Sequence, residues 1–166
     1  MKDPLFQPIT INGLEIENRI IMPAMHLGMA DAYEVTDQLT AFYAERAKGG
    51  AGLICVGYAT VDELSGNTQN IGAHDDAFIP GLTRLAAAIK NNGARSAVQL
   101  NHAGRYNFSF FINGKQPVAP SAVASRMTRE IPREMTSEDI QQTVDAFATA
   151  ACRVQQAAVA NASTVC

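Results

Sequence analysis

The sequence predicts an α/β fold in which parallel strands alternate with helices. Short, uninterrupted apolar runs recur along the chain, and segments with the 3.6-residue periodicity of amphipathic helices follow them. Glycines stand where these helical patterns stop. Strands that alternate with helices pair in parallel through right-handed crossovers. A (β/α)₈ barrel and a doubly wound sheet both satisfy this order.

A β-hairpin is predicted over residues 6–19, before the alternation begins. Apolar residues alternate with polar ones on both sides of Asn12-Gly13: Ile9, Ile11, Leu14 and Ile16. Asn-Gly between two short alternating runs is a strong hairpin signal, because both residues adopt the left-handed conformation that a type I′ turn requires.

The first predicted βα unit joins residues 19–25 to a helix that begins after Thr36. The run 19–25 has no polar alternation and is ended by Pro23, which indicates a short strand buried on both faces. Thr36 is expected to cap the helix, and Asp37 suits its first turn. Gly49-Gly50 is expected to end the helix.

Two further βα units follow in the same order. Residues 51–56 and 96–100 are the predicted strands. The second helix follows Asp75-Asp76 and stops at Gly93. The third begins at Thr136 and continues to about residue 156, and Thr136 with Asp139 resembles a capping box.

The loop over residues 101–135 favours a barrel over a doubly wound sheet. Compact domains rarely carry so long an irregular segment without a functional reason, and barrels keep their chemistry on loops that follow the strands. A doubly wound sheet would place a glycine-rich phosphate loop after a strand, whereas Gly49-Gly50-Ala51-Gly52 precedes one. Because a complete barrel needs about 250 residues, three units imply an open sheet or part of a barrel.

Composition describes a globular chain and argues against several classes of partner. The 166 residues include 16 acidic and 13 basic ones, for a net charge of −3, so nucleic acid is not expected as a partner. The sequence has no run of about 18 apolar residues, so no membrane span is predicted. The N-terminus lacks the apolar stretch of a signal peptide, and the expected location is cytoplasmic.

The cysteines and histidines predict neither disulfides nor a metal site. Cys55, Cys152 and Cys166 are far apart and form no CxxC pair, which fits reduced thiols. The histidines, at positions 26, 74 and 102, lack the spacing of metal ligands, so the metal prediction is none.

Seven motifs occur in order along the chain. They are residues 5–8 with 18–26 (LFQP, NRIIMPAMH), 42–50 (FYAERAKGG), 57–59 (GYA), 79–82 (IPGL), 99–106 (QLNHAGRY), 117–121 (PVAPS) and 132–136 (PREMT). Together they resemble the N-terminal part of the old yellow enzyme family of FMN-dependent oxidoreductases. The resemblance is to its NADH:flavin oxidoreductase and 2,4-dienoyl-CoA reductase branch.

The resemblance implies that residues 1–156 are the N-terminal part of an FMN-binding (β/α)₈ barrel, with FMN at the C-terminal mouth. NADH or NADPH would pass a hydride to the flavin, which would pass one on to an electron-poor alkene in a small-molecule substrate. The cofactor supplies that chemistry, and the protein orients it and tunes its electronics.

The resemblance also assigns residues at the strand ends. The first strand end would supply Pro23, Ala24, Met25 and His26 beside the isoalloxazine, the second would supply Gly57 and Tyr58 chiefly as backbone, and the third would supply Gln99. The carboxamide of Gln99 both donates and accepts, which matches the pyrimidine edge of a flavin. From the residues alone, a structural role is favoured, in which Pro23 and Met25 end a strand and fill core and Gln99 caps backbone; the resemblance reverses this preference. Arg105 either faces substrate or holds the long loop.

The match to the family stops near residue 156, and residues 157–166 form a divergent tail. The family continues there into a fourth strand, so its catalytic residues are expected to lie beyond this chain. Two hypotheses follow: the N-terminal portion of an FMN-dependent ene-reductase, or a non-catalytic remnant that binds flavin weakly or not at all. A sheet that stops at an unpaired strand would also favour self-association through its open edge.

Overall fold

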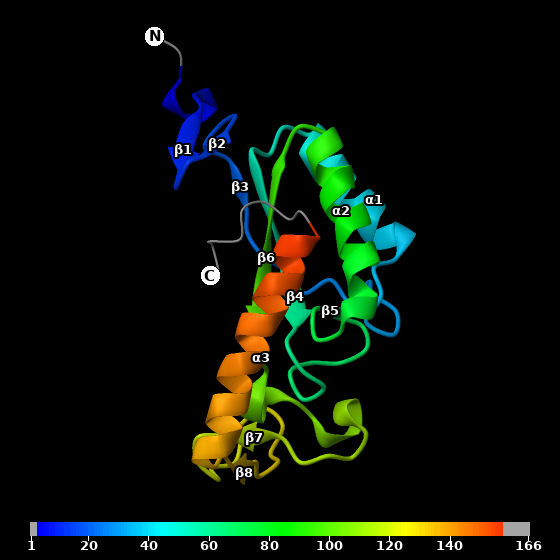
Figure 1. The fold of residues 1–166 in the computed structure, drawn as a ribbon, viewed down its shortest axis with the longest axis vertical. Helices are drawn as coiled ribbons and strands as arrows, with labels where there is room; N and C mark the ends of the chain where they lie inside the picture. The colour runs from blue at the N-terminus through cyan, green and yellow to red at the C-terminus, as the bar shows by residue number, and fades with distance from the viewer. Residues whose placement is uncertain (1–2, 158–166) are drawn as a thin grey trace.

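The computed structural model describes residues 3–157, in which helices cover one face of a parallel sheet (Figure 1). A hairpin lies at one end of the molecule, and the small β7–β8 pair lies at the other, beyond the carboxyl ends of the long strands. None of the described helices has the length and apolar composition of a membrane span.

The predicted hairpin is present. After a short 3₁₀ turn, η1 (Pro4–Phe6), strands β1 (Ile9–Ile11) and β2 (Leu14–Ile16) pair antiparallel. Asn12 and Gly13 between them have φ values of 47° and 81°, the left-handed conformations that the turn requires.

The sheet has the order β3–β4–β6, and all of its pairs are parallel. Strand β4 (Leu53–Thr60) lies between β3 (Ile21–Met22) and β6 (Arg95–Asn101). Strand β3 is shorter than its apolar run because Pro23 has no amide hydrogen to continue the ladder. Strand β5 (Ile71–Gly72), which the sequence does not predict, pairs with the last two residues of β4.

The three predicted helices form with the predicted caps. In α1 (Asp37–Lys48), the hydroxyl of Thr36 accepts from the amide of Leu39. In α3 (Ser137–Gln156), Thr136 and the residue at N3 form a complete capping box. The second helix, α2 (Ile79–Asn91), begins only after a separate 3₁₀ turn, η2 (Asp76–Phe78).

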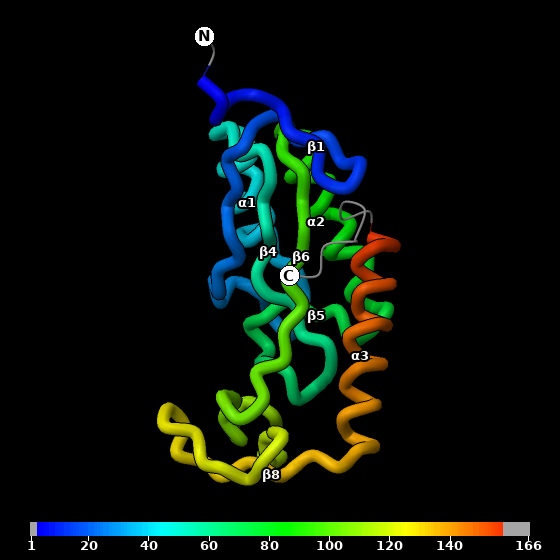
Figure 2. Tube along the Cα trace, turned by 90° about the vertical axis from the view of Figure 1, so that its left-hand side faces the viewer, coloured from blue at the N-terminus to red at the C-terminus, as the bar shows by residue number. Residues whose placement is uncertain are grey.

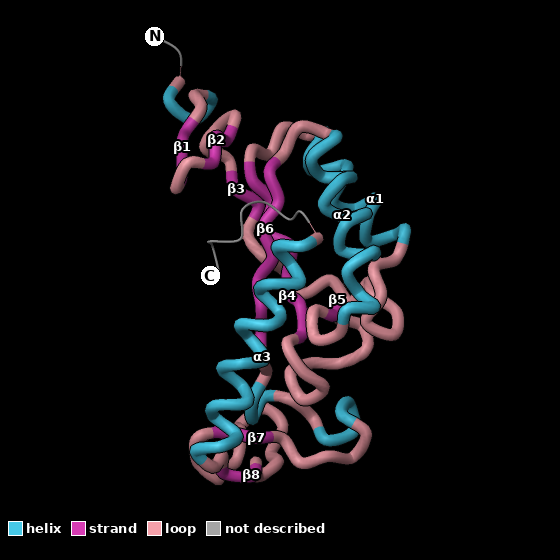
Figure 3. The backbone as a smooth tube through the Cα atoms, in the orientation of Figure 1, coloured by secondary structure: helices cyan, strands magenta, loops and turns pink. Residues whose placement is uncertain are grey.

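The segment between β6 and α3 is more ordered than the irregular loop that the sequence predicts. It contains the 3₁₀ turns η3 (Gly104–Tyr106) and η4 (Ser109–Ile112). It also contains a parallel pair of two-residue strands, β7 (Val118–Ala119) and β8 (Arg133–Glu134). Figure 3 shows these elements together beyond the carboxyl end of β6.

The core lies between the sheet and its helices. Ile54 and Val56 of β4 and Val98 and Leu100 of β6 are buried against α1, α2 and α3. The alternate residues, which point to the other face of the sheet, are only half-buried: Leu53, Cys55, Ala97 and Gln99. In Figure 2 this open face is turned toward the viewer, with α1 and α2 behind β4 and β6.

The described residues therefore form three βα units of a sheet that does not close, as predicted. Among these residues, β6 pairs only with β4, so its outer edge is open. The predicted divergent tail lies outside the described residues from position 158 onward.

Candidate functional site

The candidate site forms where the carboxyl ends of β3, β4 and β6 meet. Because the three strands are parallel, these ends lie at one edge of the sheet. Residues 23–26 follow β3 directly, Gly57-Tyr58 lie within the last four residues of β4, and Gln99 lies two residues before the end of β6. Three separate motifs of the sequence thus come to the same edge.

A β-bulge in β4 brings two of these segments into register. Val56 pairs with Val98, and the next pair is Ala59 with Leu100. Two residues of β4, Gly57 and Tyr58, therefore lie opposite the single residue Gln99. Bulges twist a strand and re-aim its side chains, and they are frequent beside active sites.

The first strand end packs directly against the bulge. A Cβ atom added to Gly57 would lie 2.7 Å from the Cβ of Ala24 and 2.7 Å from the amide nitrogen of Met25. Glycine is therefore required by the close approach of two backbone segments. Beyond this contact, the rings of His26 and Tyr58 lie side by side with centroids 5.2 Å apart.

Gln99 lies on the open face of the sheet, because its neighbours Val98 and Leu100 are buried toward the helices. Its side chain is half-buried and makes no hydrogen bond to any residue within 3–157. Met25, which follows the end of β3, is 41% exposed. An open, largely apolar wall with one amide that can donate and accept fits the pyrimidine edge of a flavin.

Arg105 lies apart from these residues. It lines a separate cleft of about 550 Å³ between η3, β7 and α3, whose lining includes none of the other predicted site residues. Its Nη2 is 3.4 Å from the Tyr106 hydroxyl, and its backbone oxygen accepts from Thr128. The sequence left the role of Arg105 open, and this geometry is compatible with both holding the loop and facing a ligand.

Sequence reasoning assigned no role to three residues that hold the site together. Tyr43, on the buried stripe of α1, accepts from the amide of Gly57 at 3.3 Å. Asp62, just after β4, faces His102, just after β6, with 3.4 Å between Oδ2 and Nε2. The signal for Tyr43 was its place on the predicted apolar face of the helix, since a phenol buried there needs a hydrogen-bond partner. No local pattern could have paired Asp62 with His102.

The electrostatics of these residues follow from their contacts. Burial raises the pKa of Asp62, but His102 and the amide of Leu64 outweigh it, so the pKa lies below its usual value. Burial lowers the pKa of His74, whose Nδ1 lies 2.9 Å from the hydroxyl of Thr60. Burial also raises the pKa of Tyr43, which therefore keeps its hydroxyl proton at neutral pH.

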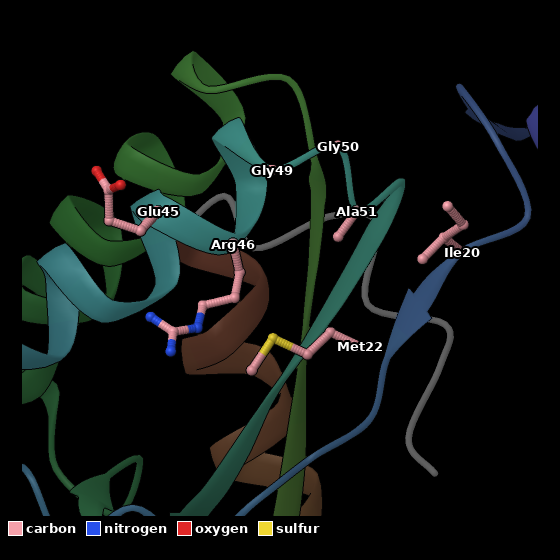
Figure 4. A pocket seen from close by; sticks show the side chains of 7 residues that line it. All are labelled: Ile20, Met22, Glu45, Arg46, Gly49, Gly50 and Ala51. Atoms are coloured by element: carbon pink, nitrogen blue, oxygen red, sulfur yellow. The ribbon is translucent and has the colours of Figure 1, made fainter.

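A second cavity, of about 400 Å³, lies at the opposite, amino-terminal end of the strands (Figure 4). Its lining includes Ile20, Met22 and the turn 49–51. Arg46 also lines it, but its guanidinium lies 3.5 Å from the centre of the Phe42 ring and donates to the Phe42 carbonyl. Figure 4 shows Glu45 pointing away from Met22. None of the predicted site residues lines this cavity.

Comparison with known proteins identifies a family. The model of the NADH:flavin oxidoreductase / NADH oxidase family matches residues 4–162. A metal reductase of Desulforamulus reducens is 48% identical over 153 residues, which are 92% of this chain and 23% of that protein. An NADPH dehydrogenase of a Geobacillus species is 36% identical over 161 residues, which are 95% of this chain and 46% of that protein.

Solved structures give the same result. A 2-naphthoyl-CoA reductase in complex with 2-naphthoyl-CoA superposes with a TM-score of 0.88 and 31% identity, over 95% of this chain and 26% of that one. Morphinone reductase superposes with a TM-score of 0.84 and 26% identity, over 93% of this chain and 45% of that one. These relatives are TIM barrels, and the chain spans between about a quarter and a half of their length.

Proposed function

Because the chain belongs to the NADH:flavin oxidoreductase / NADH oxidase family, we propose that it forms part of an FMN-dependent oxidoreductase. The enzyme would take hydride from NADH or NADPH and deliver it to an electron-poor alkene, such as an α,β-unsaturated carbonyl compound. The observation that carries the proposal is the meeting of three strand ends at the Gly57–Tyr58 bulge, opposite Gln99. FMN, when bound, supplies the hydride chemistry.

In this proposal the residues of the site hold and orient the cofactor. Gln99 hydrogen-bonds the pyrimidine edge, and its half-buried amide without a protein partner within residues 3–157 supports that role. Backbone groups of residues 23–25 and of Gly57 form the contact surface beside it. The neighbouring rings of His26 and Tyr58 close the wall at its outer end.

Arg105 is proposed to contact the substrate from the adjoining cleft. Within the described part of the chain its guanidinium has no carboxylate partner, and its neighbour is the hydroxyl of Tyr106. An unneutralised cation on a largely apolar cleft is suited to an electron-rich or anionic part of a ligand.

A second function class is favoured by how little of its relatives the chain spans. It covers 23% of the metal reductase and 46% of the NADPH dehydrogenase. We propose that these 166 residues, without the rest of a barrel, bind FMN weakly or not at all and reduce no alkene. The open edge of β6 would then favour self-association.

The reduced thiols predicted from cysteine spacing are consistent with a cytoplasmic setting.

One experiment separates the two. The 166-residue chain is purified, mixed with FMN and passed through a desalting column, and the visible flavin absorbance of the protein fraction is recorded. The same fraction is then assayed for NADH- and NADPH-dependent reduction of an α,β-unsaturated ketone. Retained flavin with enone reduction supports the enzyme, and a colourless, inactive fraction supports the non-catalytic chain. Sedimentation at several concentrations tests self-association, which a monomer at all concentrations would contradict.

A further inference from the structure

The bulge at the candidate site is fixed from the helix side by a single hydroxyl group. Tyr43 of α1 is fully buried, with 0% of its surface exposed. Its Oη accepts a hydrogen bond from the amide of Gly57, at a distance of 3.3 Å. Gly57 is one of the two residues that fall outside the β4–β6 register. The hydroxyl thus accepts from an amide at the point where the ladder is interrupted.

Gly57 is held from its other side by the first strand end. The space that a Cβ would need is occupied by Ala24 and by the backbone of Met25. The position of Gly57 is therefore set between a helix and a neighbouring strand end, and both contacts must be satisfied together. Tyr58 follows directly in the chain, and its ring packs beside His26.

We infer that Tyr43 is a positioning residue of the flavin wall, which acts through the Gly57 amide on the bulge and so on the placement of Tyr58 opposite Gln99. This inference rests on the proposed flavin site. Tyr43 itself is buried beneath the sheet and does not reach the open face. A phenylalanine would fill the same space in the core but would accept no hydrogen bond.

The test is amide hydrogen exchange of Gly57, followed by NMR in the 166-residue chain. In Tyr43→Phe, exchange of the Gly57 amide should become about tenfold faster, which is the ordinary net effect of losing one hydrogen bond. Exchange at Val98, in the regular part of β6, should change much less. The matched control is Tyr33→Phe, because Tyr33 is half-buried against His74 and Phe78 and does not touch the bulge.

A second measurement relates the bulge to the cofactor. FMN titrated into the wild type and into Tyr43→Phe, each in a chain completed to the length of its relatives and followed by flavin fluorescence, should give a dissociation constant about tenfold higher for the variant. The inference would be overturned, and Tyr43 left as a core residue, if the exchange rate of the Gly57 amide stayed unchanged or rose only by the same factor as that of the Val98 amide. If neither completed chain binds FMN, the proposed function fails, while Gly57 exchange in the 166-residue chain still decides the role of Tyr43.

Discussion

Asp62 and His102 join the ends of the two long strands, β4 and β6, with the carboxylate Oδ2 of Asp62 3.4 Å from the imidazole Nε2 of His102. The other ring nitrogen, Nδ1, accepts from the amide of Gly104 at 3.0 Å, so the proton of a neutral ring is on Nε2, facing the carboxylate. Asp62 also accepts from the amide of Leu64. The pair therefore fixes the start of both loops that follow the sheet.

Asp62→Ala should lower the free energy of unfolding by about 1–3 kcal/mol, because the part-buried amide of Leu64 loses its acceptor and the buried His102 ring loses the carboxylate that faces it. The folded-state pKa of Asp62 lies below its usual value of 3.8. Its contribution is therefore complete above that pH and is lost as the pH falls further. Urea unfolding at pH 7 and at pH 3 should show a smaller effect of the substitution at pH 3.

The matched control is Glu63→Ala, which removes the neighbouring exposed carboxylate and its ion pair with Lys115. Exposed ion pairs contribute little to stability, so this variant should resemble the wild type. Equal losses for the two variants would contradict a specific role of the Asp62–His102 pair.

His74 should make the protein less stable in mildly acidic solution. Its ring packs against Tyr33 and Phe78, and burial holds its pKa below the usual 6.5. The unfolded chain therefore takes up the proton first as the pH falls, and the free energy of unfolding decreases from about pH 6.5 downward to the folded-state pKa. His74→Asn should remove this slope in urea titrations between pH 7.5 and roughly pH 5.

Phe78→Leu is the control for His74, because it disturbs the same aromatic cluster and removes no titrating group. It should lower stability at every pH and leave a shallower slope in the same direction, because His74 remains and still packs against Tyr33. An unchanged slope in His74→Asn would show that another group causes the pH dependence.

Gly57→Ala should strain the junction of β3 and β4. The new methyl group would lie 2.7 Å from the Cβ of Ala24, so a strand end must move, and overpacking of this kind costs about 1–3 kcal/mol. Thermal unfolding measures the loss. Gly81→Ala is a suitable control, because Gly81 lies inside α2 and its nearest foreign atom would be 3.3 Å away. A Gly57→Ala protein as stable as wild type would contradict the close contact.

Local signals predicted the helices, their caps and the three main strands. Thr36, Thr136 and Asn12-Gly13 act on residues within three or four positions, so their chemistry is visible in the sequence. Strands β5, β7 and β8 have two residues each and are defined only by their pairing with another strand. Two residues are too few to show a periodicity in the sequence. The predicted long loop was therefore too irregular.

The site also has features that local sequence predicts and features that only the folded chain shows. The resemblance assigned Gly57, Tyr58 and Gln99 separately, but the bulge that sets two residues opposite one depends on the register of β4 and β6, which no single segment encodes. Tyr43 lies 14 positions from Gly57 and Asp62 lies 40 from His102, so their contacts appear only after folding. For Arg105 the sequence left two roles open, facing substrate or holding the long loop, and the cleft that it lines is formed only by the folded loop and α3.

Gln99→Leu tests the amide that is proposed to hold FMN. In a chain completed to the length of its relatives, the variant leaves polar groups of the flavin unpaired at about 1–3 kcal/mol, so FMN affinity should fall by roughly 5- to 150-fold in a fluorescence titration. In the 166-residue chain by itself, the change should be too small to measure, because one wall holds little flavin. Gln141→Leu, on the exposed side of α3, is the control and should leave affinity unchanged in both. A clear loss of FMN in the 166-residue Gln99→Leu chain would show that the wall alone forms a binding site.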